Sequence, residues 1–208
     1  RVDVAPAQRV VTVLFIDIVG FSLRSEEQEA SEVFRDLKEQ LGEMIALIHE
    51  HGGVVDKTLG DGILAFFGYR YDGSATDADH ADRAVRCAMA IQRRMMERNR
   101  RQAAAGLGVS PVRIGINSEA VFIGNLGHEE RLDFTIIGHG VNFAKRLEEA
   151  ADIFAFLAKT FDMQTPEAWA ASESGRRFGM IMPIETGMRG SNWRITIWSS
   201  SPASHTEK

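Results

Sequence analysis

The sequence predicts an α+β fold with a ferredoxin-like βαββαβ core and a C-terminal extension, and three observations carry this prediction. Short apolar runs alternate with two long amphipathic stretches in the order strand, helix, strand, strand, helix, strand. A Gly60-Asp61-Gly62 turn joins two of the apolar runs in the middle of this order, as a hairpin does. With 208 residues, of which 44% are hydrophobic and 25% charged, the chain can bury one sizeable core.

Apolar periodicity and the Gly and Pro residues that interrupt it place the elements of this core. The expected elements are Val10–Ile18 (strand), Glu29–His51 (helix), Val54-Val55 and Ile63–Phe67 (hairpin strands), Asp77–Arg101 (helix) and Val112–Ile116 (strand). Gly52-Gly53 ends the first helix. The apolar stripe of that helix is expected to face the core and consists of Phe34, Leu37, Leu41, Met44, Ile45 and Ile48.

The C-terminal extension follows the same logic. Its expected elements are strands over Ala120–Gly124 and Asp133–Ile137, a helix from Gly138 to about Ala151, and a final strand over Trp193–Trp198. Residues 151–190 show no pattern that assigns them to an element. The domain is therefore expected to span residues 10–199, between an N-terminal tail or linker over 1–9 and a C-terminal tail over 200–208.

Bulk properties exclude several classes of protein. The net charge is −5 and no basic block is present, so a nucleic-acid partner is not expected. No apolar run approaches 18 residues, so this fragment is not expected to contact a membrane. A single cysteine, Cys87, indicates a reducing, cytoplasmic compartment, with a membrane anchor elsewhere in the full-length protein left open. The chain begins with Arg, which suggests a fragment of a longer protein with a regulatory domain outside it.

Two aspartates stand where apolar runs end. Asp17 closes the first strand, and Asp61 lies in the turn of the hairpin. An aspartate at either position alone serves a cap or a turn equally well. In the βαββαβ plan, however, the end of the first strand and the hairpin lie side by side, so the two carboxylates are expected to be neighbours. Carboxylate pairs of this kind hold hard cations such as Mg²⁺ on nucleotide phosphates.

A second polar pair lies on the helix that follows Gly138. Asn142 and Arg146 are four residues apart and therefore share one helical face, close to the N-terminus of that helix. Arginine offers a planar, permanently charged donor fork that suits phosphate oxygens. Taken alone, an exposed Asn and Arg on a helix also describe an ordinary solvated face.

The blocks that contain these residues also occur together in a known family. In chain order they are Phe15–Phe21 (FIDIVGF), Lys57–Gly62 (KTLGDG), Val112–Ile116 (VRIGI), Ile123–Gly127 (IGNLG), Phe134–Gly138 (FTIIG) and Val141–Leu147 (VNFAKRL). They cover about residues 10–150. With these blocks in this order and spacing, the chain resembles the catalytic domain of class III nucleotidyl cyclases, the adenylyl/guanylyl cyclase family.

The resemblance implies roles for individual residues. Asp17, Asp61 and the backbone carbonyl of Ile18 would bind two divalent cations, Mg²⁺ or Mn²⁺. Lys57 and Thr135 would read the purine. Asn142 would orient the ribose and Arg146 would stabilise the transition state, while Arg189, before the last strand, would contact the terminal phosphates. The reaction implied is attack of the ribose 3′-hydroxyl on the α-phosphorus, with release of pyrophosphate.

Base choice and assembly follow from the same resemblance. Lys57 with Thr135 points to ATP, because the resemblance implies a Glu and a Cys at these two positions in members of the family that use GTP. Family sites form between two domains, and this chain carries both half-sets, so a homodimer with composite sites is expected. Guanylate cyclase activity, or a non-catalytic cyclase-like module that binds nucleotide, remain as alternatives. A diguanylate cyclase does not fit the Gly60-Asp61-Gly62 turn.

The chain departs from the family pattern in two places. His139-Gly140 stands where an Asp-Thr or Asn-Thr pair is more usual, and Asn117-Ser118-Glu119 stands where His-Thr-Gly is typical. Neither departure removes a residue that carries an implied role. Both bear on the geometry of the segments beside the helix of Asn142 and Arg146.

Overall fold

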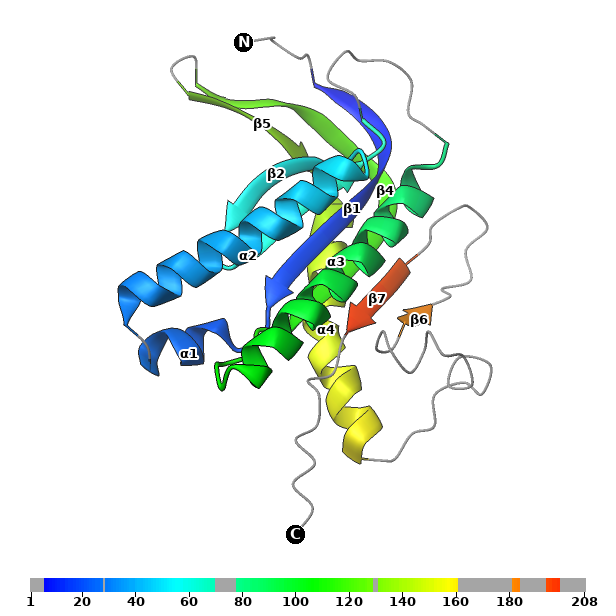
Figure 1. Ribbon diagram of the computed structural model, residues 1–208. Helices are drawn as coiled ribbons and strands as arrows, with labels where there is room; N and C mark the ends of the chain where they lie inside the picture. Colours follow the sequence, from blue (N-terminus) through cyan, green and yellow to red (C-terminus); the bar gives the residue numbers. More distant parts are fainter. Residues whose placement is uncertain are drawn as a thin grey trace.

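The protein is built on one antiparallel sheet of seven strands with helices on both faces (Figure 1). The computed structural model describes residues 6–27, 29–69, 78–128, 131–160, 181–183 and 194–198. The elements are β1 (Ala7–Ile18), α1 (Phe21–Glu27), α2 (Ala30–Glu50), β2 (Val54–Leu59), β3 (Gly62–Phe67), α3 (His80–Ala104), β4 (Val112–His128), β5 (Arg131–Ile137), α4 (His139–Thr160), β6 (Ile181–Pro183) and β7 (Arg194–Trp198).

The strand order confirms the predicted fold class. The strands lie in the order β2-β3-β1-β4-β7-β6, and β5 pairs with the second half of β4. The first four strands, with α2 and α3 as the two crossovers, form the βαββαβ core. The remaining elements extend the sheet from the outer edge of β4, where β7 pairs with its first half.

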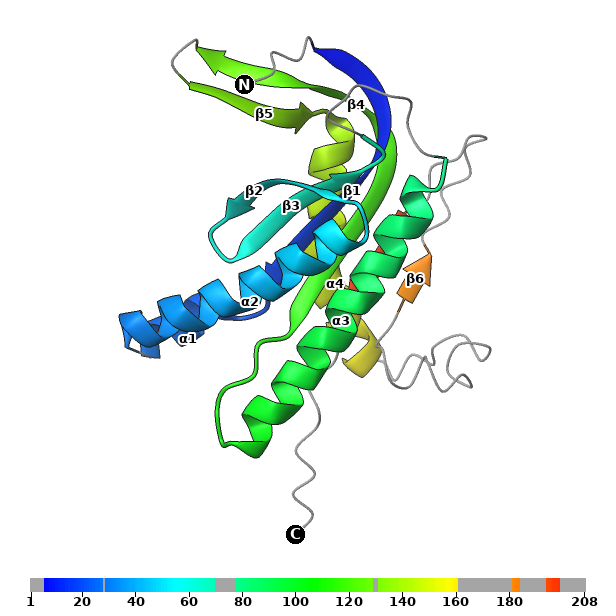
Figure 2. The same cartoon turned by 45° about the horizontal axis from the view of Figure 1, so that its top comes forward.

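The two faces of the sheet bury separate cores, because successive side chains of a strand point to opposite faces. On one face Leu14 and Ile16 of β1 pack with α2 and α3, whereas on the other Val13 and Phe15 pack with residues that include Ala144 of α4. Figure 2 shows α2 and α3 on one side of the sheet and α4 on the other. An uninterrupted apolar run in β1 is therefore what a strand covered on both faces requires.

Gly115 lets α4 lie directly on β4. A Cβ atom at this position would lie 2.1 Å from the backbone oxygen of Ala144 and 2.6 Å from the backbone nitrogen of Glu148. No side chain fits between two backbones at that separation, so the glycine sets how closely the helix approaches the sheet.

The prediction of two strands over 112–124 was wrong, because β4 is continuous through Asn117, Ser118 and Glu119. These polar residues pair in register with Val13, Thr12 and Val11 of β1. The hydroxyl oxygens of Ser118 and Thr12 lie 2.6 Å apart, and both side chains are buried. A polar stretch can continue a buried strand when its side chains find hydrogen-bond partners across the ladder.

Other differences concern element ends and surfaces. The helix α1, the strand β6 and the extension of α4 to Thr160 were not predicted. Phe34 was expected in the core stripe of α2 but is 69% exposed, whereas Met44 and Ile48 further along the helix are fully buried.

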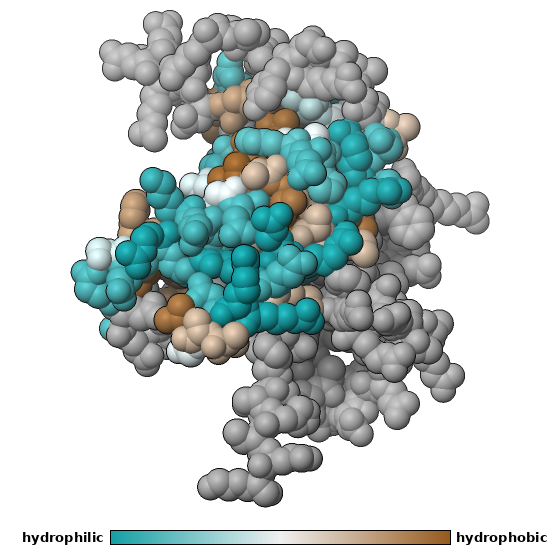
Figure 3. All heavy atoms as spheres, viewed as in Figure 1, coloured by the Kyte–Doolittle hydropathy of each residue, from teal (hydrophilic) through white to brown (hydrophobic). Residues whose placement is uncertain are grey.

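The outward surface over α2 and α3 is mainly hydrophilic (Figure 3). None of the helices in the described residues combines the length and the apolar character that a membrane span requires.

Candidate active site

The structure brings Asp17 and the turn of Asp61 together where β1 ends and β3 begins. β1 pairs with β3, so Ile16 lies opposite Ile63, next to the turn. A Cβ atom on Gly62 would lie 3.0 Å from the backbone oxygen of Ile16 and 3.4 Å from Oδ1 of Asp17. The segment that carries Asp61 therefore packs directly against the carboxylate of Asp17.

The donors at this end of β1 fit divalent cations of the Mg²⁺ or Mn²⁺ type. Asp17, Asp61 and the backbone carbonyl of Ile18 would offer oxygen ligands only, which hard cations prefer. In the described part of the chain no three His, Cys, Asp or Glu side chains group as a ready-made metal site. Mg²⁺ sites on nucleotides commonly use one or two carboxylates and complete their shell with phosphate oxygens and water, so two acids suffice.

Arg113 ties Asp17 to α4, a link that sequence reasoning missed. Arg113 lies opposite Asp17 in the β1–β4 ladder and forms ion pairs with Asp17 and with Glu148 of α4. The Glu148 side chain is only 3% exposed, so removing Arg113 would leave a buried acid without this ion pair. The available signal was a charged residue inside the apolar run VRIGI and an acid within the buried stripe of the following helix.

Lys57 and Thr135 contact one another, and Asp56 joins them. The ammonium nitrogen of Lys57 donates to Oγ1 of Thr135 over 3.1 Å, and this hydroxyl donates to Oδ2 of Asp56 over 2.9 Å. Lys57 Nζ also lies 3.6 Å from Asp56 Oδ2. Burial raises the pKa of Asp56, while the hydrogen bond from Thr135 and the charge of Lys57 oppose that rise.

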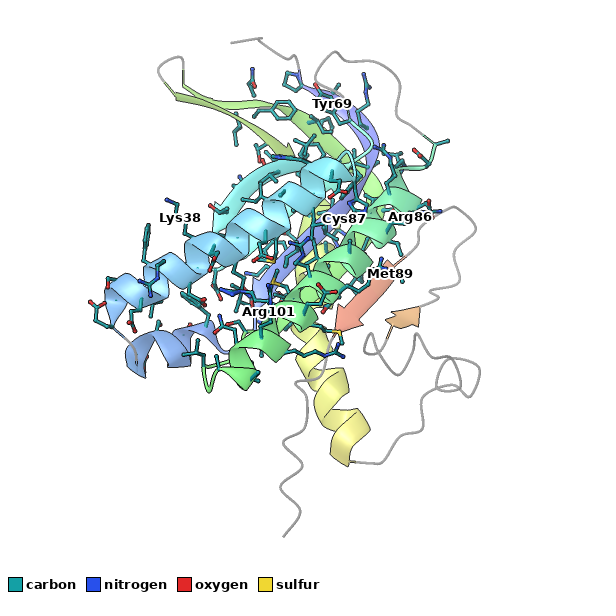
Figure 4. All side chains as sticks on the ribbon, viewed as in Figure 1. Lys38, Tyr69, Arg86, Cys87, Met89 and Arg101 are labelled. Atoms are coloured by element: carbon teal, nitrogen blue, oxygen red, sulfur yellow. The ribbon has the colours of Figure 1, made fainter. Side chains whose placement is uncertain are left out.

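An aromatic cluster supports Thr135 from the neighbouring strand position. Ring centroids are 5.3 Å apart for Tyr69 and Phe134, 6.3 Å for Phe66 and Tyr69, and 6.4 Å for Phe66 and Phe134. Tyr69 lies just beyond the end of β3, near the β4–β5 hairpin (Figure 4). Tilted ring pairs at these separations are favourable and fix β5 against the core.

Asn142 and Arg146 lie on the exposed side of α4. Ala144, Leu147 and Glu148 of the same helix are buried against the sheet, whereas both Asn142 and Arg146 are solvent-exposed. Neither side chain forms a hydrogen bond or an ion pair with the acid pair or the Lys57 cluster in the described residues. The structure therefore brings Asp17 to the turn of Asp61 and Lys57 to Thr135, and leaves this pair facing outward. Arg189 lies outside the described residues.

The two departures from the family pattern contact one another. Asn117 Nδ2 donates to the backbone oxygen of Gly140 over 3.1 Å and to Glu119 Oε2 over 3.2 Å. A Cβ atom on Gly140 would lie 2.8 Å from the Cβ of Glu119. Glu119 thus occupies the space that a side chain at position 140 would need. The altered segments are complementary and together hold the first turn of α4.

Cys87 takes no part in the site. Its thiol is buried on α3, on the side facing the sheet (Figure 4). Burial, with a smaller effect from the charge of Glu50, raises its pKa to about 12. A thiol that stays protonated and inaccessible is not a nucleophile.

The fold and this set of residues define a nucleotidyl cyclase catalytic domain. The chain belongs to the adenylate and guanylate cyclase catalytic domain family, whose model matches residues 4–154.

Relatives with curated names support the same class. The chain is 39% identical over 144 residues to an adenylate cyclase of Anabaena cylindrica and 34% identical over 138 residues to adenylate cyclase 1 of Rhizobium meliloti (strain 1021). These matches cover 69% and 66% of this chain but 28% and 20% of the relatives. The chain thus spans about a quarter of the length of these relatives.

Solved structures of both nucleotide specificities resemble the chain closely. The adenylyl cyclase CyaB from P. aeruginosa is 28% identical with a TM-score of 0.67, and the match covers 96% of this chain and 98% of that one. The guanylyl cyclase Cya2 is 26% identical with a TM-score of 0.66, and the match covers 98% of both chains. Overall similarity therefore leaves the base undecided.

Proposed function

We propose that this domain is an adenylate cyclase that converts ATP to 3′,5′-cyclic AMP and pyrophosphate. The observation that carries the proposal is the contact between Lys57 and Thr135, which sets a half-exposed ammonium donor beside the buried hydroxyl oxygen of Thr135. Adenine presents an acceptor at N1 and an exocyclic amine as donor, and this pair of groups complements both. The two relatives with adenylate cyclase names are consistent with this choice.

Each residue has a defined task in the proposed reaction. Asp17, Asp61 and the Ile18 carbonyl would hold two divalent cations, which when bound supply acidification of the ribose 3′-hydroxyl and neutralisation of the triphosphate charge. Asn142 would orient the ribose so that its 3′-oxygen lies in line with the α-phosphorus. Arg146 would donate to the phosphoryl oxygens as charge develops there, and Arg189 would contact the terminal phosphates.

A homodimer is the second part of the proposal. Asn142 and Arg146 point to solvent, and a second copy that faces them with its own acid pair and Lys57 would complete a site. Three large apolar side chains, Phe122, Leu126 and Ile137, are more than half exposed on the β4–β5 hairpin. Phe122 pairs with Ile137, and Leu126 lies on the same face four residues further along β4. Exposed apolar groups gathered on one face suit a contact between subunits.

A regulatory domain elsewhere in the full-length protein is also proposed. The relatives are about four times longer than their matched segment, which leaves ample chain for such a domain. Sensor domains commonly act on catalytic domains by changing how two subunits meet. A composite site would respond directly to such a change.

The test is product identity by mass after parallel incubation with ATP and GTP, in Mg²⁺ and in Mn²⁺. Cyclic AMP and pyrophosphate in equal amounts are the expected products. Cyclic GMP as the main product would identify a guanylate cyclase. Saturable nucleotide binding without pyrophosphate release would identify a binding module and contradict the proposal.

A further inference from the structure

Asp56 is a buried acid at the purine edge to which the mechanism above gives no task. Its side chain is 0% exposed, whereas Lys57, the next residue, is 44% exposed. Adjacent residues of a regular strand point to opposite faces, so both would not ordinarily reach one hydroxyl group. In this protein both do, because Lys57 donates a hydrogen bond to Oγ1 of Thr135 and Asp56 accepts one from it.

A β-bulge accounts for this arrangement. In the β2–β3 ladder Val55 pairs with Ala65 and Lys57 with Leu64, so Asp56 is the extra residue between two consecutive pairs. A bulge re-aims the side chains on either side of it and is often placed next to a functional site. Asp56 is thereby directed at Thr135 together with Lys57.

The hydrogen bonds at Thr135 leave one way for it to interact with a ligand. A threonine hydroxyl has one hydrogen and two lone pairs, and an ionised aspartate can only accept. Thr135 donates its hydrogen to Asp56 and accepts from Lys57, which leaves one lone pair. The remaining position can therefore accept a hydrogen bond but cannot donate one.

This asymmetry distinguishes the two purines. The exocyclic group at C6 is an amine donor in adenine and a carbonyl acceptor in guanine. A free threonine would serve either, because its hydroxyl rotates to suit the partner. A threonine whose hydrogen is committed to Asp56 matches only the amine, and it meets the guanine carbonyl with lone pair against lone pair.

We propose that Asp56 is a positioning residue for base selection, which makes Thr135 an obligate acceptor and so favours adenine over guanine. This inference rests on the proposed function, in that Lys57 and Thr135 face the purine. Asp56 itself touches neither substrate nor reacting atoms. Its contribution to base selection is assigned to the hydrogen bond with Thr135, so that contribution must vanish when the threonine hydroxyl is absent, whereas its ion pair with Lys57 remains.

The experiment measures equilibrium binding of 3′-deoxy-ATP and 3′-deoxy-GTP, which cannot be cyclised, alongside kcat/KM for ATP and GTP. The variants are Asp56→Ala, Thr135→Val, the double variant, and Thr135→Ser, which keeps the hydroxyl. Asp82→Ala, an exposed acid on α3, is the control. Asp56→Ala should lower the adenine:guanine affinity ratio about three- to tenfold, the factor that one neutral hydrogen bond is worth.

Coupling between the two residues decides the mechanism. Thr135→Val should lower the ratio by itself, Thr135→Ser should not, and adding Asp56→Ala to Thr135→Val should change nothing further. Equal weakening of both nucleotides by Asp56→Ala, or additive effects in the double variant, would overturn the inference. So would a wild-type protein that binds the two analogues equally.

The two proposals fail in different ways. A wild-type protein that binds 3′-deoxy-ATP selectively but does not cyclise ATP contradicts the proposed function, and the binding ratios of the variants still decide the role of Asp56. A wild-type protein that makes cyclic AMP, with an Asp56→Ala ratio equal to its own, contradicts only the inference about Asp56.

Discussion

The Asp56–Lys57–Thr135 cluster and the Asn142–Arg146 pair differ in how far one subunit completes them. The cluster is held by hydrogen bonds and by a bulged strand, and its acid is fully buried. The pair on α4 is exposed, without a described partner in its own subunit. A group that must discriminate between two bases gains from being fixed in advance. A group whose partner arrives with the substrate or with a second subunit must stay accessible.

The largest expected effect concerns the acid pair, Asp17 and Asp61. Asp17→Asn keeps a hydrogen-bond acceptor for Arg113 but removes the charge, and Asp61→Ala removes the second carboxylate. Each should lower kcat by at least about a hundredfold, because stabilisation of charge at the reacting phosphate is lost. Steady-state kinetics with Mg²⁺ and with Mn²⁺ measure this.

Asp82→Ala on the surface of α3 is the matched control and should have no effect on turnover. Circular dichroism of each variant separates lost chemistry from lost structure. Near wild-type turnover in either acid variant would refute the assignment of cation ligands.

The next effect tests whether the α4 pair acts on the acid pair of another subunit. Asp17→Ala and Arg146→Ala should each be nearly inactive alone, since a homodimer of either lacks one half-set at both sites. An equimolar mixture should recover roughly a quarter of wild-type activity, because half the dimers are mixed and each has one intact site of two.

The mixing experiment belongs at high protein concentration, with subunit exchange shown independently by mass or by fluorescence. If subunits exchange and activity stays absent, Asp17 and Arg146 act from the same chain. The exposure of Asn142 and Arg146 would then not reflect a site shared between two subunits.

A moderate effect is expected at the base of α4, where the two departures from the family pattern meet. Gly140→Ala places a Cβ 2.8 Å from that of Glu119 and should lower the free energy of unfolding by about 1–3 kcal/mol through overpacking. Combining it with Glu119→Gly should cost less than the sum of the two single changes. Urea denaturation measures all four proteins.

Gly108→Ala is a suitable control, since a Cβ there meets nothing within 4 Å. Additive costs at positions 119 and 140 would show that the two segments are independent. A coupled result would show that the start of the helix bearing Asn142 is held by contacts particular to this sequence.

The smallest effect concerns the stability cost of the fixed cluster. Burial raises the pKa of Asp56 above its ordinary value of 3.8, so the folded state binds this proton more tightly than the unfolded state does. The free energy contributed by Asp56 therefore favours folding increasingly as pH falls through the raised pKa toward 3.8. Ionised Asp56 opposes folding at neutral pH.

Asp56→Asn should remove this contribution and leave the protein at least as stable as wild type at neutral pH. Denaturation curves across the acid range, with Asp82→Asn as the exposed control, measure the difference in slope. A marked loss of stability at neutral pH with an unchanged slope would show instead that Asp56 holds the fold together.

Local pattern predicted much of the fold because the main signals are local. The apolar run of β1, the hairpin about Asp61 and the amphipathic helices were all visible, and the strand order followed from the βαββαβ plan. The strand β4 was divided in error, since the partners of Ser118 and Asn117 lie on β1 and α4. Phe34 was misplaced because a helical stripe does not reveal where the sheet beneath it ends.

The candidate site residues could be named from the sequence where a pattern or a family block marks them. The ends of apolar runs singled out Asp17 and Asp61, and the resemblance to the cyclase family added Lys57, whereas Asp56 was not named, because alternation along a strand would turn it away from Lys57. Only the pairing of β2 with β3 reveals the bulge that brings it back. Arg113 and Glu148 were missed for a related reason, in that their charges balance across 35 residues of chain.

The close packing of α4 against Gly115 also affects the distance between subunits in the proposed dimer. Because no side chain separates the helix from the strand, the height of Asn142 and Arg146 above the sheet is the smallest that two backbones allow. Any larger residue at position 115 would lift the helix, and in a two-fold dimer the shift would occur once in each subunit. The absence of a side chain at Gly115 thus helps to set the distance between Asn142 and Arg146 of one subunit and the acid pair of the other, across which the two subunits would share a nucleotide.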